Sequence, residues 1–207
     1  MRVHTYVIST DAGSAPNYGS PCVTLAVCKP RIRRKASVGE LVMAFAGKNV
    51  NAHEPHTVVW AGLVSEKLTF PQYWNDKRFR NKRPDRSQRP DNFYKPVGSE
   101  LVWVENNVHD PDAIGHDTGG QFVLTFPRAW RFGAHGPLLP TEFGLRMTGG
   151  RRGERVVDLT DNTWRRLRAW LDSNVDETMP DVPSDRHCEW HPPLGGSTAS
   201  IPSKRRC

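Results

Sequence analysis

The sequence has few cysteines and no long apolar run, and each shortage excludes a class of protein. Four of the 207 residues are cysteine, and no two of them have the C-x-x-C spacing of a structural zinc site or a redox motif. We therefore expect reduced thiols and no bound metal or cofactor. No window approaches the roughly 18 to 20 apolar residues that span a bilayer, and the N-terminal segment lacks the order of a signal peptide. These features predict a cytoplasmic protein that does not contact a membrane.

The motifs of the easily recognised nucleotide enzymes are also missing. The sequence contains no Walker loop, no dinucleotide-binding glycine motif, no H-E-x-x-H and no nucleobase deaminase signature. Helical segments between the strand-like runs are missing too, which excludes a doubly wound parallel sheet.

The chain has an excess of basic residues, with 29 Lys and Arg against 22 Asp and Glu and a formal charge of +7. A basic protein gains sequence-independent affinity for polyanions, because phosphate neutralisation releases counterions. Seven of these cations lie in NDKRFRNKRPDRSQRPDN, residues 75–92. So few apolar residues accompany them that the segment must lie on the surface, either as a solvated loop or as an arm that contacts nucleic acid.

Short apolar or alternating runs dominate the first two thirds of the chain. The runs of strand length are 3–9, 23–28, 41–47, 57–68, 99–106 and 121–126. Helices are expected at 70–76 and from Thr160 or Asp161 to Leu171, where Trp and Leu share one face. The pattern predicts an α+β fold: a small curved or closed, mostly antiparallel β-barrel with a few peripheral helices.

One domain over residues 1–176 is expected, because a chain of this length buries one good core. Pro, Ser and Gly dominate residues 177–207, which predicts a disordered tail. His187, Cys188 and His191 lie in that tail with C-x-x-H spacing, and the sequence leaves open whether they bind metal.

The segment DAGSAPNYGSPC, residues 11–22, separates the first two strand-like runs and carries a family resemblance together with the residues that follow it. The matching positions are Asp11, Gly13, Ala15, Pro16, Asn17, Cys22, Thr24, Leu25, Cys28, Lys29, Pro30, Ile32 and Arg33. With VVWAGLVSEKLTFPQYW, RFRNKRP, VWVENNVH and RAWRFG, they make residues 3–140 resemble the second type of the nucleotide modification associated domains of bacteria and phages. A weaker likeness, in the Val38-Gly39-Glu40-Leu41 turn and the strand after it, is to the PUA-like EVE, ASCH and YTH domains.

The resemblance implies a role with modified bases in DNA modification or phage conflict. A pocket for a base needs flat rings, polar groups that read its edge and cations for phosphate. The residues that supply these groups are Asp11, Asn17, Tyr18, Lys29, Arg31, Arg33, Tyr73 and Trp74. The leading interpretation is a domain that binds nucleic acid or a nucleotide, with protein partners in a modification system.

Two other functions remain open from the sequence. An enzyme that modifies a base or nucleotide would use Cys22 or Cys28 as nucleophile, His109 or His56 as base and Asp11 as orienting acid. A structural adaptor would use the amphipathic helix and the basic segment to hold a partner protein. Neither the base, the modification nor the oligomeric state follows from the sequence.

Overall fold

The computed structural model describes residues 1–9, 13–51, 57–145 and 153–175. Ten strands form in them, and they lie at β1 Arg2–Ile8, β2 Val23–Leu25, β3 Leu41–Ala46, β4 Val58–Leu63, β5 Glu66–Thr69, β6 Tyr94–Val97, β7 Glu100–Trp103, β8 Phe122–Phe126, β9 Ala129–Arg131 and β10 Glu154–Asp158. The α-helices are α1 Pro30–Lys35, α2 Phe70–Asn75, α3 Ile114–Thr118 and α4 Asp161–Ser173. Three 3-10 helices accompany them: η1 Lys77–Lys82, η2 Pro111–Ala113 and η3 Thr141–Phe143.

The strands form three sheets. The largest has the order β10-β1-β3-β4-β9, the second β2-β8-β5, and β6 pairs with β7 as a hairpin. All these pairings are antiparallel except β1 with β3. The α+β class and the mostly antiparallel pairing are therefore confirmed. A closed barrel is not confirmed, because each sheet of the described residues has two ends.

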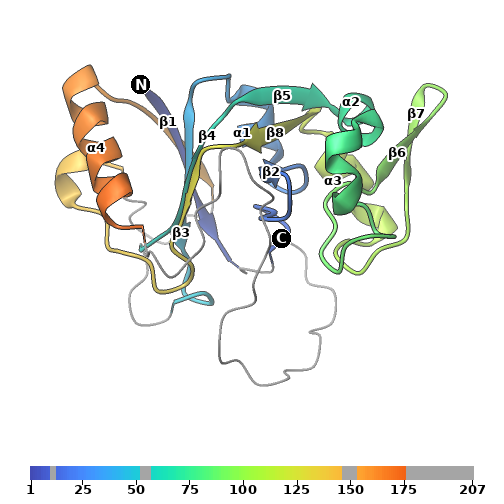
Figure 1. The fold of residues 1–207 in the computed structure, drawn as a ribbon, viewed down its shortest axis with the longest axis horizontal. Helices are drawn as coiled ribbons and strands as arrows, with labels where there is room; N and C mark the ends of the chain where they lie inside the picture. Colours follow the sequence, from blue (N-terminus) through green and yellow to red (C-terminus); the bar gives the residue numbers. More distant parts are fainter. Residues whose placement is uncertain (10–12, 52–56, 146–152, 176–207) are drawn as a thin grey trace.

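Strand β3 is buried on both faces, since its alternate side chains enter two different cores. Val42, Ala44 and Ala46 pack in a core with Trp60 and residues of β8. The intervening side chains of β3 pack in a second core, which α4 completes with Leu167 and Leu171. Helix α4 thus covers one face of the five-stranded sheet at one end of the molecule (Figure 1). Its Thr160 accepts a hydrogen bond from the backbone N–H of Thr163, so the helix begins where the sequence predicts.

The expected strand at 57–68 is two strands that belong to different sheets. β4 ends at Leu63 and β5 starts at Glu66, and the chain crosses between the sheets there. A Cβ atom at Gly62 would meet Trp60 at 2.8 Å and Phe126 at 2.9 Å. Glycine is therefore required at position 62, because a side chain there would clash with these two rings.

The third core forms the end of the molecule opposite α4, where Figure 1 shows α2, α3 and the β6–β7 hairpin. Its buried residues include Cys22, Cys28, Tyr73, Phe93 and Tyr94. Two groups of buried polar side chains lie beside it, and both involve residues that the sequence singled out. The single domain over 1–176 and the tail over 177–207 stay predictions.

Candidate functional site

The loop before β2 folds back onto that strand. Asn17 and Thr24 exchange two backbone hydrogen bonds, each of 2.9 Å. The Asn17 side chain accepts from the N–H of Gly19 and donates to the carbonyl of Arg89. Asn17 is 2% exposed, so its polar groups connect segments of the protein.

A buried lysine and a buried aspartate fasten this loop to η1. Lys82 Nζ donates to Asn17 Oδ1 at 2.7 Å and to Thr24 Oγ1 at 2.9 Å. Asp91 accepts from Thr24 Oγ1 at 2.5 Å and from the Tyr73 hydroxyl at 2.7 Å. We call these five residues the Lys82–Asp91 network. Burial raises the pKa of Asp91, and the charge of Lys82 opposes that rise.

The other residues predicted to contact a base or phosphate are spread over the fold. Arg131 lies over the Tyr18 ring at 4.3 Å, and Lys29 Nζ lies 5.2 Å from the centre of the Tyr6 ring. Burial lowers the pKa of Lys29. Arg31 is exposed and pairs with Glu154 at 3.3 Å. Asp11 and His56 lie outside the described residues, as do His187, Cys188 and His191.

Arg33 is the most deeply buried of these cations. It is 0% exposed, and its guanidinium donates to the carbonyl oxygens of Cys28, Phe122 and Asp117. Burial lowers its pKa to about 10. In this arrangement the donors are directed at backbone carbonyls rather than toward solvent.

The basic segment 75–92 is ordered in its first half. Phe79 and Lys82 are buried and anchor η1, while Lys77, Arg78 and Arg80 are exposed. The Asp76 carboxylate accepts from the backbone N–H of Arg78 and caps the turn. Within the segment predicted as a surface loop or arm, residues 77–82 therefore form a 3-10 helix, and residues 83–92 form turns and bends.

Trp74 and Arg83 form a stacked pair beside η1. The Arg83 guanidinium lies 4.2 Å from the centre of the Trp74 ring and donates to the Trp74 carbonyl. Desolvation lowers the pKa of Arg83, and the charges of Arg80 and Arg86 lower it further, against an opposing contribution from Asp85. We call Trp74, Arg80, Arg83 and Arg86 the arginine face. Its cations repel one another, so a bound anion would relieve that repulsion.

The sulfur of Cys28, an imidazole and a carboxylate meet where β2, α1 and α3 come together. Cys28 Sγ lies 3.5 Å from His109 Nε2, and His109 Nδ1 lies 2.6 Å from Asp117 Oδ2. All three residues are buried, and their ligand atoms lie within 4.8 Å of one another. The sequence named Cys28 as a candidate nucleophile and His109 as a candidate base, and the fold brings them together across 81 positions.

Asp117 is the member of this centre to which the sequence assigned no role. It occurs in the His-rich and Asp-rich segment VENNVHDPDAIGHDTGG, but nothing in that pattern separates it from Asp110 or Asp112. Its carboxylate also accepts from the Cys28 N–H and the Tyr94 hydroxyl, each at 2.7 Å. Burial acts to raise the pKa of Asp117, but these bonds and the His109 charge outweigh it, so the pKa is lowered.

The backbone at Cys28 has an unusual conformation. Cys28 and Lys29 have φ of 53° and 44°, in the left-handed region where a non-glycine residue costs of order 1–3 kcal/mol. The Arg33 guanidinium stabilises this turn by donating a hydrogen bond of 2.8 Å to the Cys28 carbonyl. Such strain is maintained where the surrounding bonds require it, and here they direct Sγ toward His109.

The two described cysteines differ in redox state. Cys22 forms no disulfide and is 7% exposed, in the same core. Cys28 is disulfide-bonded. The expectation of reduced thiols is therefore wrong for Cys28.

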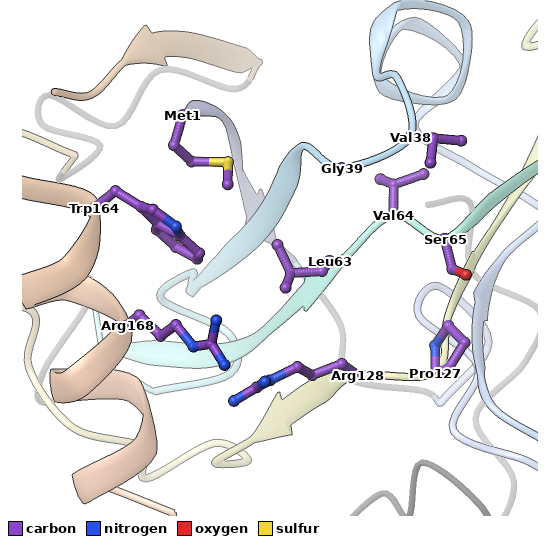
Figure 2. A pocket seen from close by; sticks show the side chains of 10 residues that line it. All are labelled: Met1, Val38, Gly39, Leu63, Val64, Ser65, Pro127, Arg128, Trp164 and Arg168. Carbon is purple, nitrogen blue, oxygen red and sulfur yellow. The ribbon is translucent and has the colours of Figure 1, made fainter. Parts of the chain in front are cut away.

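A surface groove of about 470 Å³ lies elsewhere, between α4 and the end of β4. Figure 2 shows Trp164 and Arg168 of α4 facing Leu63 and Arg128 across it. None of the residues predicted to bind a base lines this groove, and neither buried polar group reaches it. Among the described residues, no helix is long and apolar enough to cross a membrane.

The fold and these sites define a basic α+β protein with an ordered cationic surface and a buried group of a cysteine sulfur, an imidazole and a carboxylate. Residues 1–189 match the family model of nucleotide modification associated domain 2. The chain belongs to this family, whose name associates the family with nucleotide modification. The match extends the resemblance beyond residue 140. No curated protein and no solved structure matches the chain.

Proposed function

We propose that this protein binds a nucleic acid or nucleotide that carries a modified base and contributes recognition to a DNA-modification or phage-conflict system. The observation that carries the proposal is the arginine face, where Arg83 stacks on Trp74 beside Arg80 and Arg86. Guanidinium groups bind phosphate, and an indole offers a surface on which a base stacks. The family's association with nucleotide modification supports the choice of ligand.

The structure also supports a connection between the arginine face and the loop that the sequence singled out. Lys82 ties η1 to Asn17, and the Arg89 side chain lies against Gly13, where a Cβ atom would approach it to 2.9 Å. The loop and the cationic segment are thus held together. Tyr18 and Lys29 are not part of the arginine face, and their contact with a ligand stays a prediction, as do protein partners and a cytoplasmic location.

Oligonucleotide binding tests the proposal. Labelled single-stranded and duplex DNA, each with and without a hypermodified pyrimidine, are titrated with the full chain at several salt concentrations. We expect tighter binding to the modified strands and a steep loss of affinity with salt. Negligible and equal binding to all of them would falsify the proposal.

Charge reversal on the arginine face locates the surface. Arg80→Glu with Arg86→Glu is expected to weaken binding about tenfold or more, and to reduce the salt dependence by about one for each lost phosphate contact. Arg165→Glu with Lys95→Glu makes the same change of charge on exposed residues of α4 and β6. Equal losses in the two double variants would indicate attraction by net charge alone.

A second candidate function is catalysis at the Cys28–His109–Asp117 centre. Reduction of the Cys28 disulfide gives a thiol next to an imidazole that a carboxylate orients, which is the arrangement of an activated nucleophile. Mass spectrometry of nucleosides from DNA made with the protein and its genomic neighbours tests this candidate. A modified nucleoside that disappears with Cys28→Ser, while the Arg80 and Arg86 variant retains it, would support catalysis at this centre.

A further inference from the structure

We infer that the groove between α4 and the end of β4 binds a nucleotide, with the base on Trp164 and the phosphate at Arg128 and Arg168. This site is separate from the arginine face, and it goes beyond the recognition of a nucleic acid proposed there. The groove volume of about 470 Å³ lies within the range of about 300–1,000 Å³ that small-molecule sites have. No sequence pattern indicates the groove, because its lining residues come from distant parts of the chain.

The floor of the groove is apolar and continuous with the second core. Met1 and Leu63 are partly buried and pack against that core, and so does Trp164. Val38 lines the same groove and is 61% exposed, so water contacts apolar surface there. A flat apolar ring that covers this surface releases the water, which favours binding.

Trp164 differs from the other tryptophans around it in its contacts. The rings of Trp74 and Trp130 each lie beside a guanidinium, and those of Trp60 and Trp170 pack against other aromatic rings. Among the described residues, no ring or cation lies against Trp164, and no acceptor receives its indole N–H. An indole on the wall of a groove is a surface on which a base stacks.

Two guanidinium groups supply the positive charge for a phosphate. Arg128 Nη2 lies 3.3 Å from Asp172 Oδ1, and Arg168 Nε lies 3.8 Å from Asp172 Oδ2. One carboxylate thus holds both cations at the same end of the groove, where Figure 2 shows them, and it leaves a net positive charge. The arginine side chains are 45% and 43% exposed, so these ion pairs are weak and a phosphate can compete for both guanidinium groups.

The apolar and cationic parts of the groove together select a ligand with an aromatic ring and an anionic group. A nucleoside lacks the anion and inorganic phosphate lacks the ring, so we expect each to bind less tightly than a nucleotide. A free nucleoside monophosphate and the phosphorylated end of a strand both carry the required pair of groups. The family's association with nucleotide modification favours a nucleotide over other aromatic acids.

Calorimetric titration of the full chain with the 2′-deoxynucleoside 5′-monophosphates of the common bases tests the inference. We expect at least one of them to bind about tenfold more tightly than its nucleoside or inorganic phosphate does. A 5′-phosphorylated tetranucleotide is added as a competitor: displacement assigns the groove to strand ends, and no displacement assigns it to free nucleotides. A wild type that binds none of the monophosphates, or that binds inorganic phosphate as tightly, would overturn the inference.

Variants of the groove separate the two contacts. Arg168→Glu and Trp164→Ala should each weaken nucleotide binding about tenfold, by loss of a phosphate contact and of stacking respectively. Trp164→Phe retains a ring and should recover most of the affinity. Arg165→Glu is the matched control, because Arg165 on α4 is exposed and does not line the groove. The double variant of the arginine face should bind mononucleotides as the wild type does, so failure of the proposed function and failure of this inference are distinguishable.

Photocrosslinking locates the base without any variant. In 5-iodo-2′-deoxyuridine 5′-monophosphate, light breaks the C–I bond, and the base carbon bonds to a carbon of the ring stacked on it, with loss of HI. We expect peptide mass spectrometry to find the product on Trp164. A product on Trp74 in place of Trp164, or a folded Arg168→Glu that binds as tightly as wild type, would rule out this site.

Discussion

Two buried carboxylates in this protein have similar supports and opposite properties. Asp91 and Asp117 each accept a hydrogen bond of 2.7 Å from a buried tyrosine, Tyr73 in one case and Tyr94 in the other. Burial dominates at Asp91 and raises its pKa, whereas at Asp117 the bonds from His109, Cys28 and Tyr94 lower it. Burial of charge alone therefore does not mark a chemical site.

The difference lies in where each group of side chains ends. The Lys82–Asp91 network connects the loop before β2 with η1, and its ammonium and hydroxyls donate to protein oxygens. The Cys28–His109–Asp117 centre ends at an imidazole nitrogen and a sulfur 3.5 Å apart, which become reactive groups when the Cys28 disulfide is reduced. We assign a structural role to the first and chemistry to the second.

The largest effect is expected from removing the cation of the structural network. Lys82→Met leaves the buried oxygens of Asn17 and Thr24 without this donor, and leaves Asp91 without its opposing charge. We expect a loss of about 3–5 kcal/mol in the free energy of unfolding, measured by urea denaturation. Lys77→Met, on the exposed side of η1, should change it by less than about 0.5 kcal/mol.

The same variant also sharpens the assignment of roles. If Lys82→Met remains folded at low temperature, the alkylation rate of Cys28 in the reduced protein should stay within about twofold of wild type. A large change in that rate in a folded Lys82→Met protein would show that the two groups are not independent.

The pH dependence of stability should have opposite signs for the two carboxylates. An ordinary Asp titrates near pH 3.9. Because the pKa of Asp91 is raised, the folded state holds more protons than the unfolded state just above pH 4, so its contribution to stability falls as the pH rises there. Because the pKa of Asp117 is lowered, its contribution is present above about pH 4 and is lost as the pH falls below it.

Amide variants separate the two contributions. Asp91→Asn should remove the loss of stability above pH 4, and Asp117→Asn should reduce the loss in more acidic solution. Urea denaturation at half-unit steps from pH 2.5 to 6 measures both. Identical pH profiles for the two variants would contradict the assigned pKa directions.

The smallest effects are expected at the two tyrosines. Tyr73→Phe and Tyr94→Phe each remove one hydroxyl that donates to a buried carboxylate, at a cost of about 1–3 kcal/mol. Only Tyr94→Phe should alter the alkylation rate of Cys28 in the reduced protein, since Asp117 acts on the sulfur through His109. Equal alkylation rates in the two variants would remove the distinction between the two groups.

The periodic parts of the fold could be predicted from the sequence. The strand-like runs and the amphipathic helix correspond to β1, β3, β8 and α4, because alternation and helical spacing reflect which faces are buried. The division of residues 57–68 between two sheets could not be predicted, since no proline or glycine separates Leu63 from Glu66. Strand β10 was missed because four of its five residues are polar or exposed at the edge of the sheet.

The candidate site was only partly predictable. Cys28 and His109 were recognised as reactive types, and Trp74 as a surface for stacking. Asp117 could not be recognised, because its sequence context resembles that of the neighbouring Asp110 and Asp112. Lys82 could not be recognised either, because it lies in a run of cations that is typical of a solvated surface. Burial distinguishes them, and burial is a property of the packed fold.

Composition and local pattern determined that this chain is a basic α+β protein with a cationic segment, because charge and periodicity are summed along the chain. The tertiary structure decided which of the cations are buried, which carboxylate faces His109 and which thiol lies beside it. Those choices depend on contacts between residues tens of positions apart, and in a folded interior such contacts set the hydration and the pKa of every polar group.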